Sequence, residues 1–220
     1  MAVEIVAGVP RDSLIYHLAR VVHWVQNASV AHYPTHVLRQ LHLAPWAEFA
    51  ILQFQILTGG NRLAHLVQWL AMVGSVLGVS RIAAQCGAGA RGQILAAVFC
   101  GTIPMGILQS TSTQNDYVLS FWLVCLVYFS RALTTPGPGQ GATASAWLVG
   151  AALGLAILTN GTAYILAAPF VAVMAVHVAW QRRSRAAFTL AIVAVAVLSL
   201  NAGHYWRNAR LYGTPLGSRA

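Results

Sequence analysis

The sequence is short of charge. Only 8% of its 220 residues are charged, four of them acidic, and all 13 basic residues are arginine because the chain contains no lysine. A soluble domain carries roughly 25% charged residues, so this composition excludes an ordinary soluble protein. The net charge of +9 reflects the scarcity of acids, and we expect no nucleic-acid partner. Several arginines stand between apolar runs, where the planar guanidinium can grip lipid or substrate phosphate.

Cysteine is scarce as well. The chain has three, Cys86, Cys100 and Cys125, and their spacing is not that of metal ligands. His32 and His36 have i,i+4 spacing, but a proline between them disfavours the helix that would place both on one face. These residues therefore give no defined metal site.

Long apolar runs fill the sequence instead, and 58% of the residues are hydrophobic. A membrane span needs about 20 apolar residues, and lipid cannot satisfy backbone polar groups, so spans are helices or closed barrels. The runs are continuous and do not alternate at period two, which favours helices. We expect spans at about 63–84, 93–110, 117–133, 145–158, 162–180 and 185–202, with Thr159-Asn160-Gly161 as the turn between the fourth and fifth. The predicted fold is an all-α, multi-pass transmembrane helical bundle.

The segment before these runs predicts an external loop, residues 11–62, with two interfacial helices. Residues 11–27 place five apolar side chains on one helical stripe, as in a helix that lies on a membrane surface: Leu14, Leu18, Val21, Val22 and Val25. Residues 45–58 are apolar but too short for a full span. We treat residues 1–220 as one membrane domain, with about six spans over 63–202 and an external segment at 203–220.

A count of crossings groups the connecting segments. If each run crosses once, residues 1–62, 111–116 and 203–220 share one side of the membrane. The other side receives 85–92, 134–144 and the compact QRRSR loop near 181–185. Short loops dominate the charge-bias rule, so the QRRSR side leans cytoplasmic and the first group external.

The acidic residues are the first candidates for chemistry. Three of the four, Asp12, Glu48 and Asp116, lie on the external side at the edge of an apolar segment. A carboxylate at such an edge is costly unless paired or solvated, which makes it a functional candidate. A structural role is equally open for two of them, because Asp12 and Asp116 could each cap a helix N-terminus.

Polar and basic residues accompany these acids. Asp12, Tyr16 and Arg20 recur every four residues along the polar face of the first helix. His36 and Arg39 follow in the loop, and Arg207 and Arg210 return on the same side. A carboxylate base among arginines suits group transfer from a phosphate-linked donor, with arginine stabilising the departing phosphate.

Five segments resemble bacterial membrane glycosyltransferases of the GT-C fold, the relatives of protein O-mannosyltransferases and of the lipid A aminoarabinose transferase. They are DSLIYHLARVVHWVQNASVAHYPTH, APWAEFAILQFQILTGGNR, GILQSTSTQNDYVLSFW, LGLAILTNGTAY and GHYWRNARLYGTPLG. The resemblance implies an inverting glycosyltransferase of the bacterial inner membrane that takes a sugar from a polyprenyl-phosphate donor, within membrane lipid, to a periplasmic acceptor.

The same resemblance assigns roles to particular positions. Asp12 matches the family's catalytic acid, and Asp116 matches a further acid at the start of a later span. Glu48 follows Pro45, whereas the family's acid precedes a Lys-Pro pair, so the resemblance leaves the second carboxylate and a divalent metal ion open. Relatives begin with an earlier span and continue beyond RNARLYGTPLG, so we expect a chain truncated at both ends.

Two other functions fit the same composition. A transporter or flippase for a lipid-linked or anionic substrate would place ionisable residues near mid-membrane, whereas these acids lie at span edges. A non-catalytic membrane remnant would leave the acids far apart with no shared cavity. The sequence does not identify the sugar, the acceptor or the oligomeric state.

Overall fold

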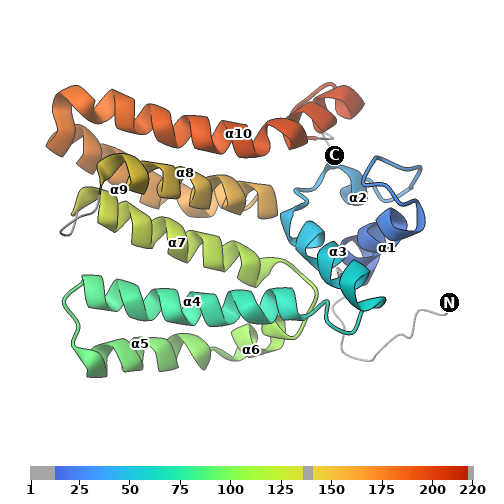
Figure 1. Ribbon diagram of the computed structural model, residues 1–220, viewed down its shortest axis with the longest axis horizontal. Coiled ribbons are helices and arrows are strands. Elements are labelled where there is room, and N and C mark those ends of the chain that lie inside the picture. The colour runs from blue at the N-terminus through green and yellow to red at the C-terminus, as the bar shows by residue number, and fades with distance from the viewer. Residues whose placement is uncertain (1–12, 136–140, 218–220) are drawn as a thin grey trace.

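The computed structural model describes residues 13–135 and 141–217, and every regular element in these ranges is a helix (Figure 1). A π-helical turn, η1 (Ser13–His17), leads into α1 (Leu18–Gln26). The remaining helices are α2 (Arg39–His42), α3 (Trp46–Thr58), α4 (Leu66–Gln85), α5 (Ala90–Gly101), α6 (Pro104–Ser110), α7 (Asp116–Thr134), α8 (Ala142–Thr159), α9 (Ala163–Arg182) and α10 (Ala186–Tyr212), with a short 3-10 turn, η2 (Arg183–Arg185), before α10. The predicted all-α, multi-pass bundle is confirmed.

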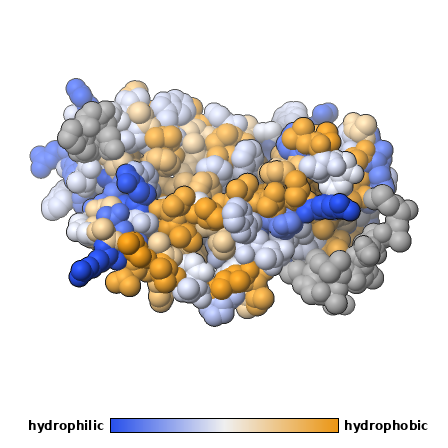
Figure 2. Space-filling model, turned by 60° about the horizontal axis from the view of Figure 1, so that its bottom comes forward, coloured by the Kyte–Doolittle hydropathy of each residue, from blue (hydrophilic) through white to orange (hydrophobic). Residues whose placement is uncertain are grey.

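Five helices in the described ranges are long and apolar enough to cross a membrane: α4, α7, α8, α9 and α10, the last counted with η2. Residues 145–180 form two helices that break at Asn160, as predicted. The exposed surface between the two ends of the bundle is largely apolar, as a lipid-facing belt requires (Figure 2).

The predicted span at 93–110 is not one straight helix. It is two helices, α5 and α6, bent by 67° at Thr102 and Ile103. Pro104 explains the break, because proline lacks an N–H and pushes the preceding residue into extended backbone, where Ile103 lies. The helix at the C-terminus differs in the other direction: α10 continues to Tyr212, past the predicted end at residue 202.

Glycines allow the spanning helices to approach closely. A Cβ on Gly150 or Gly154 of α8 would meet Ala196 or Leu200 of α10 at 2.6 and 2.8 Å. These two glycines are four residues apart, the small-xxx-small spacing that brings membrane helices together. On the other side of the bundle, α4 packs against α7 through a second such pair, described below.

The two ends of the bundle differ. Figure 1 places α1, α2, α3, the α6–α7 connection and the C-terminal end of α10 at one end, as the crossing count predicts. The opposite end carries the α4–α5 and α9–α10 turns. We call residues 13–58 the cap.

The cap packs against the bundle through an apolar core that includes Val21, Trp24, Ile51, Val67 and Val118. Its inward face matches the predicted stripe only in part, through buried Val21. Val25, assigned to the apolar side, is 43% exposed, whereas Arg20, assigned to the polar side, is 1% exposed. The reason is tertiary, since α3 supplies a carboxylate opposite Arg20.

Candidate functional site

A buried charge cluster organises the cap. Glu48, in the first turn of α3, is fully buried, and its Oε1 lies 2.6 Å from Nδ1 of His17 and 3.7 Å from Nη1 of Arg20. Burial acts to raise the pKa of Glu48, but the Arg20 charge and the His17 hydrogen bond outweigh it, so the pKa lies below its ordinary value. Glu48 is therefore a carboxylate held by two cationic or proton-donating partners, and it is closed to solvent.

Arg20 joins three parts of the cap. Its Nε donates to the carbonyl of Gln40 at 2.6 Å, and its Nη2 donates to those of Arg39 and Leu43 at 2.9 and 3.1 Å. The guanidinium lies 5.7 Å from the ring centre of Trp24. Arg20 thereby fixes α2 against α1, and it holds a positive charge in the interior with Glu48 as its counter-ion.

Gln40 completes this network. Its side-chain oxygen accepts hydrogen bonds from Tyr33 Oη at 2.9 Å and Thr35 Oγ1 at 3.2 Å, and its Nε2 donates to the carbonyl of Ile15 at 2.6 Å. The long connection before α2 is thus ordered by buried polar contacts, as polar groups taken out of water require.

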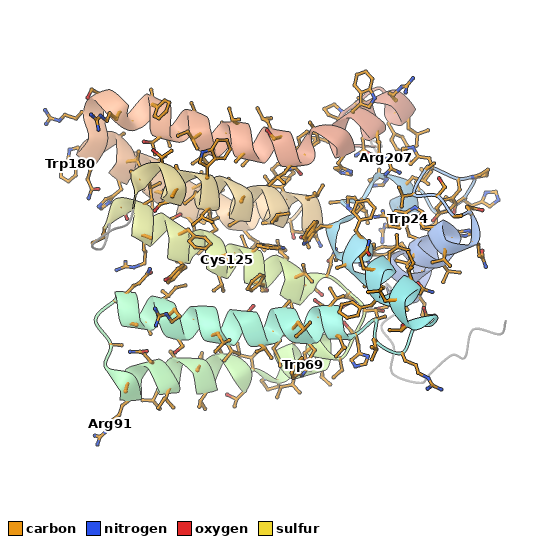
Figure 3. All side chains as sticks on the ribbon, viewed as in Figure 1. Trp24, Trp69, Arg91, Cys125, Trp180 and Arg207 are labelled. Carbon is orange, nitrogen blue, oxygen red and sulfur yellow. The ribbon has the colours of Figure 1, made fainter. Side chains whose placement is uncertain are left out.

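A narrow pocket opens where the cap meets α10. Its polar walls come from both parts: Arg20, His32, Tyr33 and Gln40 from the cap, and His204 and Arg207 from α10. Figure 3 labels Trp24 and Arg207 on the two sides of this junction. No carboxylate lines the pocket in the described residues, so its walls carry only neutral or positive groups.

The electrostatics of the pocket favour an anion. Burial lowers the pKa of His32, and the nearby charge of Arg207 lowers it further. His32 is therefore a neutral imidazole, and the positive charge at the pocket comes from the guanidinium groups. The pocket itself has a volume of about 10 Å³, room for about one water molecule, so a phosphate or another anion would meet these groups at its mouth, where Arg207 is partly exposed.

Contacts from α10 hold the pocket together. Nη2 of Arg207 donates to the carbonyl of Val30 at 2.7 Å. Nδ2 of Asn208 donates to the carbonyl of His42 at 3.1 Å. These bonds join segments far apart in sequence, which explains why the extended C-terminal part of α10 belongs to the site.

Asp116 lies elsewhere at the same end of the molecule. It is the exposed first residue of α7, and Asn115 occupies the N-cap position. The backbone N–H groups of Tyr117 and Val118, in the first turn of α7, donate to Oε1 of buried Gln68 at 2.9 and 3.1 Å. Gln68 thus takes the capping role that the sequence left open for Asp116, whose carboxylate stands in the first turn where the helix dipole favours it.

Asn115 has its own partner. Its Nδ2 donates to the carbonyl of Thr159 at 2.8 Å, and its Oδ1 accepts from Nδ2 of Asn160 at 3.0 Å. These hydrogen bonds join the start of α7 to the α8–α9 turn, and they fix the position of Asp116 at the first residue of α7.

The other predicted site residues are spread over the cap and α10. The Tyr16 ring lies tilted against that of His17, with 4.3 Å between their centres. His36 and Arg39 are exposed, and the Arg210 guanidinium lies 5.6 Å from the ring centre of Trp206. Asp12 lies outside the described residues. The structure thus brings Arg20 and Arg207 to one pocket and puts Glu48 in contact with Arg20, while Asp116, His36, Arg39 and Arg210 do not line that pocket.

Sequence reasoning missed three residues of the site: His17, Gln40 and His204. A local signal existed for His17, because Ser13, His17 and Arg20 share one helical face with Trp24. None existed for Gln40 or His204, whose importance comes from contacts across the chain.

A divalent metal ion does not fit the described residues. Among them, no three His, Cys, Asp or Glu side chains are close enough to hold one. The carboxylate of Glu48 is bonded to His17 and faces Arg20, whose positive charge would repel a cation. We assign no step to a metal.

The fold and the site define a class: a multi-pass helical membrane protein with a basic pocket at its cap end. Comparison with known families defines this class further: residues 43–206 match the profile of the dolichyl-phosphate-mannose-protein mannosyltransferase family. The chain belongs to this family and is a multi-pass membrane glycosyltransferase of the GT-C type. No curated protein and no solved structure matches it. The matched range contains Glu48, Asp116 and His204 and begins after Asp12 and Arg20.

Proposed function

We propose that the protein transfers a sugar, with inversion, from a polyprenyl-phosphate donor to an acceptor at the cap side of the membrane. In a bacterial cell this is the periplasmic face of the inner membrane. The observation that carries the proposal is the mouth of this pocket, where Arg207 offers positive charge to a phosphate and no carboxylate of the described residues forms part of the lining. The family membership supplies the reaction class.

The proposed reaction is a single displacement at the anomeric carbon of the sugar. The acceptor oxygen forms a bond to the anomeric carbon, the bond from that carbon to the phosphate oxygen breaks, and the polyprenyl phosphate leaves with the electron pair. Asp12, assigned as general base by resemblance, takes the acceptor proton. A positive group placed where the negative charge of the leaving phosphate develops lowers the barrier, and this is the role proposed for Arg207, with His204 as a neutral hydrogen-bonding neighbour.

The remaining residues have supporting or separate roles in this proposal. Arg20 is buried and paired with Glu48, so its proposed role is to hold the cap wall of the pocket in place, and Glu48 positions Arg20 without meeting substrate. Asp116, exposed at the same end, is proposed to face the acceptor. Tyr16, His36, Arg39 and Arg210 are proposed to contact the donor or the lipid surface at the rim of the cap.

The proposal is tested in membrane vesicles that hold the full chain, supplied with polyprenyl-phosphate mannose. The readout is release of free polyprenyl phosphate, which does not require the acceptor to be identified. Asp12→Asn should lower turnover by about 10²- to 10⁴-fold, the usual contribution of a positioned base. Arg207→Gln should weaken donor use about tenfold, and Arg207→Lys less.

Arg62→Gln provides a matched control, because Arg62 is exposed at the cap end and does not line the pocket. It should keep wild-type turnover. Full activity of Asp12→Asn, at unchanged protein level in the membrane, would remove Asp12 from the mechanism. Equal losses in Arg62→Gln and Arg207→Gln would remove the pocket from it.

A further inference from the structure

A groove runs between α4 and α7, away from the cap. It has a volume of about 260 Å³ and is lined by Gly74, Gly78 and Arg81 of α4 and by Phe121, Val124, Cys125 and Tyr128 of α7. Figure 3 labels Cys125 where α7 faces α4. The lining residues of α4 are spaced four and three positions apart in sequence, and those of α7 three, one and three positions apart, so each set lies on one face of its helix.

Glycine allows the two helices that form this groove to pack in direct contact. A Cβ on Gly74 would lie 2.6 Å from the Phe121 ring, and one on Gly78 would collide with the side chain of Val124. Any larger residue would force the two helices apart. The walls are therefore bare backbone on one side and aromatic or aliphatic side chains on the other, a surface suited to a hydrocarbon chain.

One end of the groove is charged. Arg81 is exposed and lies a turn before the end of α4, at the end of the bundle opposite the cap. Nη2 of neighbouring Arg131 donates to the carbonyl of Gln85 at 3.0 Å, which fixes α7 to α4 just beyond the groove.

The surroundings of Arg81 are uniformly positive. Arg91, Arg183 and Arg185 are exposed at the same end of the bundle. Both acids in the described part of the chain, Glu48 and Asp116, belong to the other end. A headgroup at this end therefore meets arginine and no described carboxylate.

We propose that this groove binds an anionic glycerophospholipid, with one acyl chain lying in the groove along the contact between α4 and α7 and the phosphate at Arg81. The apolar walls take the chain, and the charge at the mouth selects the headgroup, because a basic side chain near the membrane surface attracts anionic lipid. The groove belongs to the half of the protein remote from the cap pocket. The lipid is therefore a resident structural ligand, and its binding does not depend on the proposed transferase reaction.

The test uses purified full-length protein in nanodiscs that contain phosphatidylcholine with or without phosphatidylglycerol. A phosphatidylglycerol probe with a diazirine in its acyl chain is photolysed, and the crosslinked peptides are mapped. We expect crosslinks within residues 121–128, at higher yield than with the matching phosphatidylcholine probe. Arg81→Gln should reduce the preference for the anionic probe about fivefold, the effect of one basic residue at the surface.

Two further variants separate this site from general charge. Arg91→Gln removes an exposed arginine at the same end that does not line the groove, and it should leave the preference unchanged. Cys125→Trp fills the groove and should abolish crosslinking to 121–128. The proposal is overturned if both probes label the protein equally, if Arg81→Gln and Arg91→Gln have equal effects, or if the crosslinks are confined to other helices. The result for Arg81→Gln decides the question even if Cys125→Trp fails to fold.

Discussion

The stability of the cap should depend on Arg20 far more than on its exposed neighbours. We expect Arg20→Met to leave Glu48 as a buried carboxylate with one partner, His17, and breaking a buried ion pair from one side costs about 3–5 kcal/mol. The carbonyls of Gln40, Arg39 and Leu43 lose their donor as well, although water can reach part of this region. We expect a total loss of about 4 kcal/mol in the free energy of cap opening.

Hydrogen exchange read by mass spectrometry measures that loss directly. Because every 1.4 kcal/mol is a factor of ten, amides of α1 and α3 should exchange roughly a thousandfold faster in Arg20→Met. Amides of α8, in the separate bundle core, should be unchanged. Arg39→Met removes an exposed arginine side chain but keeps the carbonyl that Arg20 uses, and it should alter cap exchange by less than about threefold.

A second substitution identifies the cause. The double variant Arg20→Met with Glu48→Leu removes both charges, and a buried ion pair replaced by apolar residues is often neutral. We expect it to recover about 2 kcal/mol of the loss. Cap exchange within threefold of wild type in Arg20→Met would refute the reasoning. No recovery in the double variant would assign the loss to the three carbonyls instead of the buried charge.

Two other predictions follow from the same structure. The pKa of Glu48 lies below its ordinary value, so the folded cap binds fewer protons than the unfolded cap. The stability that ionised Glu48 gives the cap is complete above the ordinary pKa of a glutamate and is lost as the pH falls through the lowered pKa. Protection of α3 amides should therefore fall in acid, and Glu48→Gln should abolish that dependence. Cys86 is exposed at the arginine-rich end of the bundle, so an impermeant maleimide should label it in inside-out vesicles and not in intact spheroplasts. A cysteine introduced at exposed Ala31 in the cap should be labelled in intact spheroplasts and not in inside-out vesicles. Labelling of Cys86 in intact spheroplasts would invert the proposed orientation.

The sequence by itself determined the class of fold and the division of the chain between membrane and cap. Apolar runs of span length force helices, because lipid offers the backbone no hydrogen-bond partners, and the TNG turn at Asn160 separates α8 from α9. The order of connecting segments then followed from counting crossings. The sequence pattern did not reveal the bend before Pro104, because the apolar run continues through this proline although a straight helix cannot.

Only the tertiary structure decided what the polar residues do. Helical periodicity placed Arg20 on the polar face of the first helix, but the structure buries it beside Glu48, which lies 28 positions later in the sequence. No local sequence pattern encodes that ion pair. Asp116 looked like a helix cap until Gln68 of another helix proved to hold those N–H groups. The pocket exists only because α10 returns His204 and Arg207 to the cap, so its chemistry depends on contacts between residues far apart in the chain.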